Sequence, residues 1–310
     1  MSGRTGQDPA ERRFAAMIRE LAIPAPFKLS EFGACLERRT GRAVELAPVI
    51  MAADAPSGVW LRTGRADYFY YEEQTPPFHQ AHIVLSLAAQ MLLGDGSGSS
   101  VDRLLVPDVS PQLVRLMLGD TDGRPVAPGE AEAFAFLALE SAEAAGYPPL
   151  LARRAIRQLA PLYSALRAGV PEAVGAADCM DRAGARFRLC RQVIEIRDAV
   201  LALRPYRDPE VALAAQRDGR AAGLSGAGLA AAVEAAVLAS ALAAWNAGRR
   251  VPDAGSGTDW VPLCRSDLRS EVTCLAQVSR AFGRLRLDGR PARAGASEAR
   301  SGEASLCVWA

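Results

Sequence analysis

The spacing of apolar and polar residues divides the chain into two parts. Segments rich in β-branched and aromatic residues, which predict strands, occur in the first part at 44–51, 59–63 and 67–72. Gly64-Arg65 separates the last two and predicts the turn of a hairpin. From about residue 148 the spacing is helical throughout. The pattern predicts an α+β fold, in which a part with a small hairpin or sheet is followed by an all-α helical bundle.

Capping residues predict where the helices begin and end. In the first part, helices are expected at 9–21, at 30–40 and from 76 to 93. For the last of these, Thr75 is the expected N-cap, and Gly94 is expected to close the final turn in a left-handed conformation. In the second part, the expected helices run from Pro149 toward Arg167, from 182 to 204, from Asp208, from Ser225 to Gly248 and from 263 to 282.

The length of the chain predicts more than one domain. With 310 residues, half of them apolar, it exceeds the usual size of a single domain. We expect one domain at 1–147, a helical domain at 148–284 and a flexible tail at 285–310.

The predicted helix at 76–93 carries one polar stripe on an otherwise apolar surface. His82, Ser86 and Gln90 follow one another at intervals of four residues, so they lie on one face of the helix. If this face is buried, each polar group needs a partner. The simplest expectation is that His82 is a hydrogen-bonded core histidine and that His79 lies near the helix start.

Sequences around this helix resemble ImmA/IrrE-type metallopeptidase-like proteins of bacteria, over about residues 10 to 145. The resemblance rests on Leu36-Glu-Arg-Arg-Thr-Gly-Arg, Trp60-Leu-Arg-Thr-Gly-Arg-Ala-Asp-Tyr, Glu72-Glu-Gln-Thr-Pro-Pro-Phe-His-Gln and Glu130-Ala-Glu-Ala-Phe-Ala. It implies a zincin-like N-terminal domain, in which a hairpin leads into a helix that normally carries His-Glu-x-x-His. A glutamate on a later helix normally supplies the third zinc ligand, and Glu130 matches its context.

The resemblance also implies that the zinc chemistry is lost. Ser86 and Gln90 stand in place of the two histidine ligands, and Leu87 stands in place of the general base. An alternative site one turn earlier would use His79, His82 and Glu130, but no carboxylate base accompanies that pair of histidines. We therefore expect no metal, no cofactor and no zinc-dependent proteolysis.

A second resemblance covers about residues 162 to 284. It rests on Leu162-Tyr-Ser-Ala-Leu, Val193-Ile-Glu-Ile-Arg-Asp-Ala-Val-Leu-Ala-Leu-Arg-Pro-Tyr and Gly223-Leu-Ser-Gly-Ala-Gly-Leu-Ala-Ala-Ala-Val-Glu-Ala-Ala. These segments are similar to the cytosolic helical domain of an uncharacterised bacterial family of multi-pass membrane proteins. The resemblance marks as candidates Glu195, Arg197, Asp198, Arg204 and Tyr206. The simpler interpretation of Arg197 and Asp198 is that they pair with residues of neighbouring helices.

Charge and cysteine content restrict the partners. The net charge is +1, from 36 basic and 35 acidic residues, so no overall field favours nucleic acid or an anionic membrane. The six cysteines include no CxxC pair, which favours reduced thiols in the cytoplasm. The apolar stretch 224–245 is interrupted by glycines and Glu234 and predicts a buried helix instead of a membrane span. Assembly into a homo-oligomer stays open.

Two functions follow from these patterns. The leading hypothesis is a non-catalytic, peptidase-like regulatory or adaptor protein that binds a protein or a small molecule. The alternative is a metal-independent enzyme of small-molecule biosynthesis that uses the former zinc cleft, with His82, Glu130 and Ser86 as pocket groups and Gln90 as an orienting residue.

Overall fold

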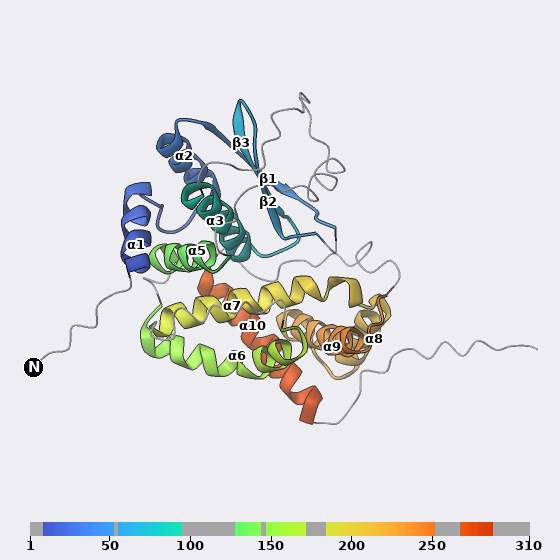
Figure 1. The fold of residues 1–310 in the computed structure, drawn as a ribbon. Coiled ribbons are helices and arrows are strands. Elements are labelled where there is room, and N and C mark those ends of the chain that lie inside the picture. The colour runs from blue at the N-terminus through green and yellow to red at the C-terminus, as the bar shows by residue number, and fades with distance from the viewer. Residues whose placement is uncertain are drawn as a thin grey trace, which may run out of the picture.

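The chain has an α+β fold in which a three-stranded sheet lies at one end and helices form the rest, as the sequence predicts (Figure 1). The structure is a computed structural model and describes residues 9–52, 55–94, 128–143, 147–171, 184–251 and 267–287. The predicted tail at 285–310 lies outside the described residues from residue 288 onward.

The sheet consists of β1 (Ala43–Val49), β2 (Gly58–Arg62) and β3 (Ala66–Glu72), in the order β1-β3-β2. The predicted hairpin is confirmed, because β2 and β3 pair antiparallel, and β1 lies parallel to β3 on its other side. The strand predicted to reach Met51 ends at Val49 instead. The backbone N–H of Met51 donates to the carboxylate of Glu72 at 3.2 Å, so the chain leaves the sheet at this point.

The helices of the first part are α1 (Pro9–Leu21), α2 (Leu29–Thr40), α3 (Pro77–Leu93) and α5 (Pro128–Glu143). The expected cap of α3 is wrong: Pro76 is the N-cap, and the hydroxyl of Thr75 lies 2.7 Å from Nδ1 of His79. Gly94 is also not left-handed, with φ −67° and ψ 162°. Its N–H still bonds to the carbonyl of Gln90 at 3.0 Å, so extended backbone ends this helix without the predicted left-handed turn.

The described residues of the second part form helices and the turns between them, as predicted. Its elements are α6 (Pro149–Gly169), α7 (Ala185–Ala202), the short 3-10 helix η3 (Arg204–Tyr206), α8 (Pro209–Ala221), α9 (Gly226–Asn246) and α10 (Leu268–Leu287). The helix predicted to run to Arg204 ends at Ala202, because Pro205 cannot supply the N–H that a continued α-helix would use. The last helix passes the predicted end at 282 and includes the first residues of the expected tail.

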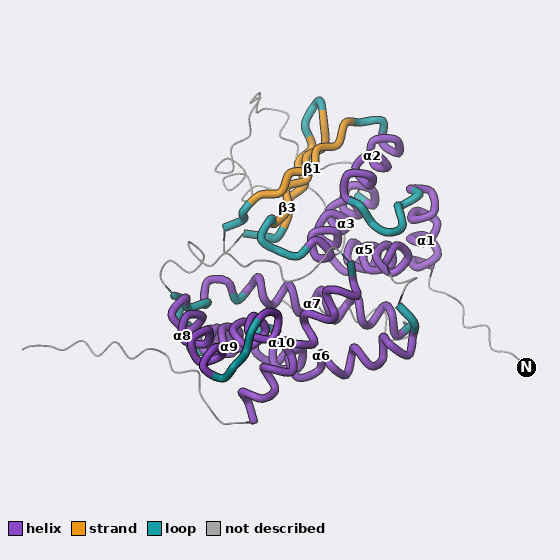
Figure 2. Tube along the Cα trace, turned by 180° about the vertical axis from the view of Figure 1, so that it is seen from behind, coloured by secondary structure: helices purple, strands orange, loops and turns teal. Residues whose placement is uncertain are grey.

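Helix α7 lies between the two parts of the molecule. Helices α3 and α5 contact it on the side toward the sheet, and α6 and α10 contact it on the other side (Figures 1 and 2). The buried apolar side chains form one cluster that runs from Phe14 on α1 to Phe282 on α10. A common core therefore crosses the predicted domain boundary at 147/148.

Polar contacts also join the second part to the sheet. Nη2 of Arg204 lies 2.6 Å from the carboxylate of Glu72, which is fully buried at the end of β3. Nη1 of Arg204 donates to the carbonyl of Met51 at 3.0 Å. These contacts hold η3 against the end of the sheet.

Helix α9 is less buried than its sequence predicts. Among the described residues it is the one helix long and apolar enough to cross a membrane, and 39% of its most apolar window is buried inside the molecule. Its buried residues face α8, α10 and α6, and include Glu234, which accepts from Nη2 of Arg207 at 2.6 Å. The helix predicted to be buried is thus buried on one side and exposed over the rest of its surface.

Candidate functional site

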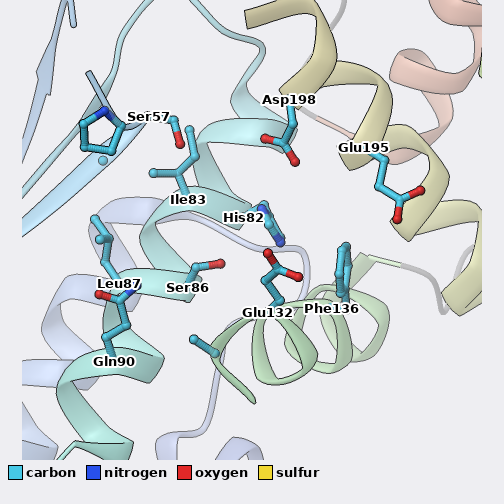
Figure 3. A pocket seen from close by; sticks show the side chains of 13 residues that line it. Ser57, His82, Ile83, Ser86, Leu87, Gln90, Glu132, Phe136, Glu195 and Asp198 are labelled. Carbon is cyan, nitrogen blue, oxygen red and sulfur yellow. The ribbon is translucent and has the colours of Figure 1, made fainter. Parts of the chain in front are cut away.

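A pocket lies where α3, α5 and α7 meet. It has a volume of about 330 Å³, and its lining includes residues 56–58, which lead into the first residue of β2. His82, Ser86 and Gln90 of the predicted polar stripe all line it, so one face of α3 forms a wall (Figure 3). Apolar side chains complete the lining, among them Ile83, Leu87 and Phe136.

His82 is the deepest polar group of this wall. Its side chain is buried, and its Nε2 has no hydrogen-bond partner among the described residues. The expected hydrogen-bonded core histidine is therefore buried, but this nitrogen is not paired within the described part of the chain. Burial lowers the pKa of His82 to about 4, and this effect outweighs the neighbouring carboxylate of Asp198, which acts in the opposite direction. The ring is neutral at neutral pH and packs against Phe136, with centroids 4.9 Å apart.

Ser86 lies one turn after His82 and has the same property. Its Oγ is buried and has no hydrogen-bond partner among the described residues. Its side chain points toward Glu132 in Figure 3. Two adjacent turns of α3 thus each place at the pocket a residue with a buried polar atom that is unpaired within the described ranges, whereas Gln90 lies at the exposed end of the stripe.

The carboxylate that α5 contributes is Glu132, which the sequence analysis did not select. Glu130, the expected third ligand, is exposed and is not among the residues that line the pocket. Burial raises the pKa of Glu132, and the like charges of Asp198 and Glu195 raise it further, while Arg191 acts in the opposite direction. Phe136 also lines the pocket one turn later on α5, and this spacing is the signal that could have identified the face.

Helix α7 contributes two more carboxylates, both already engaged. Glu195 accepts from Nε of Arg191 at 2.7 Å and from the hydroxyl of Tyr163 at 2.5 Å. Asp198 lies with Oδ1 2.8 Å from Nε2 of His79. The pocket therefore brings together residues that the sequence selected separately in the two parts of the chain.

The other candidates of the second part lie elsewhere. Arg197 is buried and pairs with Glu271 on α10, as the simpler interpretation predicts. Arg204 bonds to Glu72 and Met51, and the ring of Tyr206 packs against Trp245 with centroids 5.0 Å apart. None of these three side chains lines the pocket, and each has a structural partner.

The pocket residues do not fit a zincin-type metal centre. Ser86, Leu87 and Gln90, the residues that the predicted resemblance places at the zinc-site positions, line the pocket and supply neither an imidazole ligand nor a carboxylate base. In the alternative set, both ring nitrogens of His79 are already engaged and Glu130 lies outside the pocket. Across the described ranges, no group of three or more His, Cys, Asp or Glu side chains is placed to hold a metal ion.

The pocket instead combines a negative side with a neutral polar side. Glu132, Glu195 and Asp198 are contributed by α5 and α7, and the unpaired atoms of His82 and Ser86 are contributed by α3 (Figure 3). A neutral imidazole and a hydroxyl can each donate or accept a hydrogen bond. A pocket of this size and mixed lining has the properties of a small-molecule site.

Comparison with known proteins gives one match. Residues 150–285, less than half of the chain, are similar to a protein family described as "Family of unknown function (DUF6545)". No curated protein and no solved structure matches the chain. The match overlaps the helical part from α6 to α10 and includes Glu195 and Asp198, but its description names no activity. The similarity of the first part to ImmA/IrrE-type proteins stays a prediction.

Proposed function

We propose that this protein is a non-proteolytic regulatory protein that binds a small molecule in the pocket between α3, α5 and α7. The observation that carries the proposal is that His82 and Ser86 line one cavity and that each has a buried polar atom, Nε2 of His82 and Oγ of Ser86, without a hydrogen-bond partner among the described residues. Leaving a buried polar group unpaired costs about 1–3 kcal/mol. A ligand that bonds to both atoms would recover that cost.

The position of the pocket supports a regulatory role. Its walls come from both predicted parts of the chain, since α3 and α5 precede residue 147 and α7 follows it. A ligand that contacts α3 and α7 together would strengthen their packing. Binding would then be reported to any partner that recognises the arrangement of these helices. Residence in the cytoplasm and assembly into a homo-oligomer stay predictions within this proposal.

A thermal-shift screen of a metabolite library tests the proposal. The wild type is compared with Ser86→Leu, whose longer side chain fills the pocket, and with Ser164→Leu, which makes the same change at an exposed position on α6. A ligand at a hundred times its Kd stabilises the folded state by about 2.7 kcal/mol. Compounds that stabilise the wild type and Ser164→Leu but not Ser86→Leu support the proposal. A screen without such compounds, with Ser86→Leu folded by circular dichroism, contradicts it.

The non-proteolytic part of the proposal has a separate test. Purified protein supplemented with zinc is expected to leave a fluorogenic peptide library uncleaved, because the aligned positions Ser86, Leu87 and Gln90 cannot assemble the zinc-bound water and its base. Zinc-dependent cleavage that Ser86→Leu abolishes would contradict this.

A metal-independent enzyme is the second candidate. It is favoured by one observation, the neutral imidazole of His82 in the same pocket as Glu132, a carboxyl with a raised pKa. A neutral imidazole and a carboxyl group can act as a general base and a general acid. Chemical change of a bound compound by the wild type, lost in both His82→Gln and Glu132→Gln, would favour this candidate over simple binding.

A further inference from the structure

We propose that the ligand is a small organic cation, an ammonium or a guanidinium, joined by a short chain to a hydroxyl group. This inference rests on the proposed function, because it assigns the chemistry of the same pocket. The cationic group would lie against Glu132, and the hydroxyl would bond to His82 and Ser86.

The carboxylates on the negative side of the pocket favour a cationic ligand. Three carboxylates line it, and two of them have partners: Glu195 is bonded to Arg191 and Tyr163, and Asp198 to His79. Within the described part of the chain, Glu132 makes no hydrogen bond or ion pair of its own. Burial raises its pKa most, the like charges of Asp198 and Glu195 raise it further, and Arg191 acts in the opposite direction. A ligand cation beside Glu132 would stabilise the charged form of this carboxylate.

The polar groups on the neutral side of the pocket favour a hydroxyl group on the ligand. His82 lines the cavity and is only 7% exposed, and its Nε2 is buried and has no hydrogen-bond partner among the described residues. Since its pKa lies at about 4, the ring is uncharged and does not repel a cation. Together with the Oγ of Ser86 it forms a donor–acceptor pair, and a hydroxyl group can satisfy both.

The apolar lining favours a short hydrocarbon chain in the ligand. Ile83, Leu87 and Phe136 border the same space and favour methylene groups between the two polar ends of the ligand. An anionic ligand fits poorly, because the three carboxylates would repel it. The nearby guanidinium of Arg191 is already bonded to Glu195, with Nε 2.7 Å from the carboxylate. An inorganic metal ion is not favoured either. In the described ranges, no three ligating side chains, the three carboxylates of the pocket included, are placed so that they could hold one ion together.

Three probes of nearly equal length test this inference by isothermal titration calorimetry. They are 4-aminobutan-1-ol, butane-1,4-diol and 4-hydroxybutanoate, which share the hydroxyl end and differ in the charge of the other end. We expect 4-aminobutan-1-ol to bind the wild type about tenfold more tightly than the diol, and 4-hydroxybutanoate to bind most weakly. Equal or tighter binding of the diol or the anion overturns the inference, as does failure of the amine to bind.

A pair of variants locates the cation. Glu132→Gln removes the unpaired charge and is expected to weaken 4-aminobutan-1-ol binding about tenfold while leaving diol binding within about twofold. Glu140→Gln is the matched control, because Glu140 lies two turns later on α5, has a pKa raised by burial and does not line the pocket. It should bind like the wild type. Equal effects of the two variants overturn the assignment of Glu132.

The outcomes separate this inference from the proposed function. One outcome is that neutral or anionic library compounds bind to the wild type but not to Ser86→Leu, while 4-aminobutan-1-ol does not bind. This outcome contradicts the cationic ligand and supports small-molecule binding in the pocket. If no compound of any charge binds in that way, both fall.

Discussion

His79 on α3 and Asp198 on α7 are in direct contact, with Nε2 of the imidazole 2.8 Å from Oδ1 of the carboxylate across 119 residues of sequence. The other ring nitrogen lies 2.7 Å from the hydroxyl of Thr75, so both nitrogens of this fully buried ring are bonded. Asp198 also lines the pocket. This contact therefore connects the two predicted parts of the chain at the wall of the candidate site.

Removing this contact should destabilise the fold. We expect Asp198→Ala to lower the free energy of unfolding by about 1–3 kcal/mol, because it leaves a buried imidazole nitrogen without its partner. Urea denaturation followed by circular dichroism measures the change. Glu31→Ala is the control, since its pair with Lys28 is exposed on both sides and should change stability by no more than about 0.5 kcal/mol. Equal losses in the two variants would show that the contact contributes nothing beyond a surface pair.

The lowered pKa of His82 predicts a loss of stability in mild acid. Its folded-state pKa of about 4 lies below the ordinary value of 6.5, so the unfolded chain takes up a proton first as the pH falls. The free energy of unfolding should therefore decrease from about pH 6.5 downward, and this residue alone should account for about 2 kcal/mol between pH 7 and pH 5. Asp198 and His79 act on this group in opposite directions and do not cancel the effect of burial.

His82→Gln isolates this contribution. The variant keeps a polar side chain but cannot titrate, so its free energy of unfolding should fall less steeply over the same pH range, measured by urea titration at each pH. Glu132 has a raised pKa, so its effect on the pH dependence of the free energy of unfolding has the opposite sign. Because Glu132 is present in both proteins, this effect cancels in the comparison. Identical slopes for the wild type and His82→Gln would show that His82 is protonated normally in the folded state.

The regular elements were largely predictable from the sequence because their signals are local. The aromatic segments on either side of Gly64-Arg65 form the β2–β3 hairpin, and Pro149, Asp208 and Ser225 stand at or next to the starts of α6, α8 and α9. Errors occurred where a side-chain contact other than the expected one formed. Thr75 bonds to His79 instead of capping α3, and Met51 bonds to Glu72 instead of continuing β1.

The site was predictable only in part. His82, Ser86 and Gln90 share a face by helical periodicity alone, and they line one pocket. Glu130 was selected from the family resemblance, and Glu132 was not. Residues two apart on a helix point about 200° away from each other, so these two side chains lie on opposite sides of α5. A shift of two positions in the alignment moves a carboxylate from the pocket to the surface. The approach of Asp198 to His79 depends on the packing of α7 and leaves no local signal in the sequence.

Gly58 marks a close approach that the sequence analysis did not identify. A Cβ atom at this position would lie 2.5 Å from Cγ2 of Ile83 and 3.0 Å from Cδ1 of Leu87. The Ile83 methyl is attached to a branched Cβ with little rotamer freedom, so the backbone or α3 must move. We expect Gly58→Ala to lower the free energy of unfolding by about 1–3 kcal/mol.

Gly64→Ala is the matched control for that change. A Cβ at Gly64 meets nothing within 4 Å, and the residue lies in the turn of the same hairpin. Chemical denaturation should show a change of less than about 0.5 kcal/mol for Gly64→Ala. If Gly58→Ala is tolerated equally well, the contact between β2 and α3 is looser than the structure indicates.

The pair of Arg204 and Glu72 should be the most sensitive link between η3 and the sheet. Among the described residues, Arg204→Met leaves the fully buried carboxylate of Glu72 with backbone donors alone, from Met51 at 3.2 Å and Gln74 at 2.8 Å. Removing one partner of a buried ion pair costs about 3 kcal/mol or more. Arg220→Met, at an exposed position in the last turn of α8, should cost less than about 0.5 kcal/mol. In the double variant Arg204→Met/Glu72→Gln the uncompensated charge is gone, so denaturation should show a higher stability than for Arg204→Met alone. Additive losses in the double variant would mean that the two side chains stabilise the fold independently of each other.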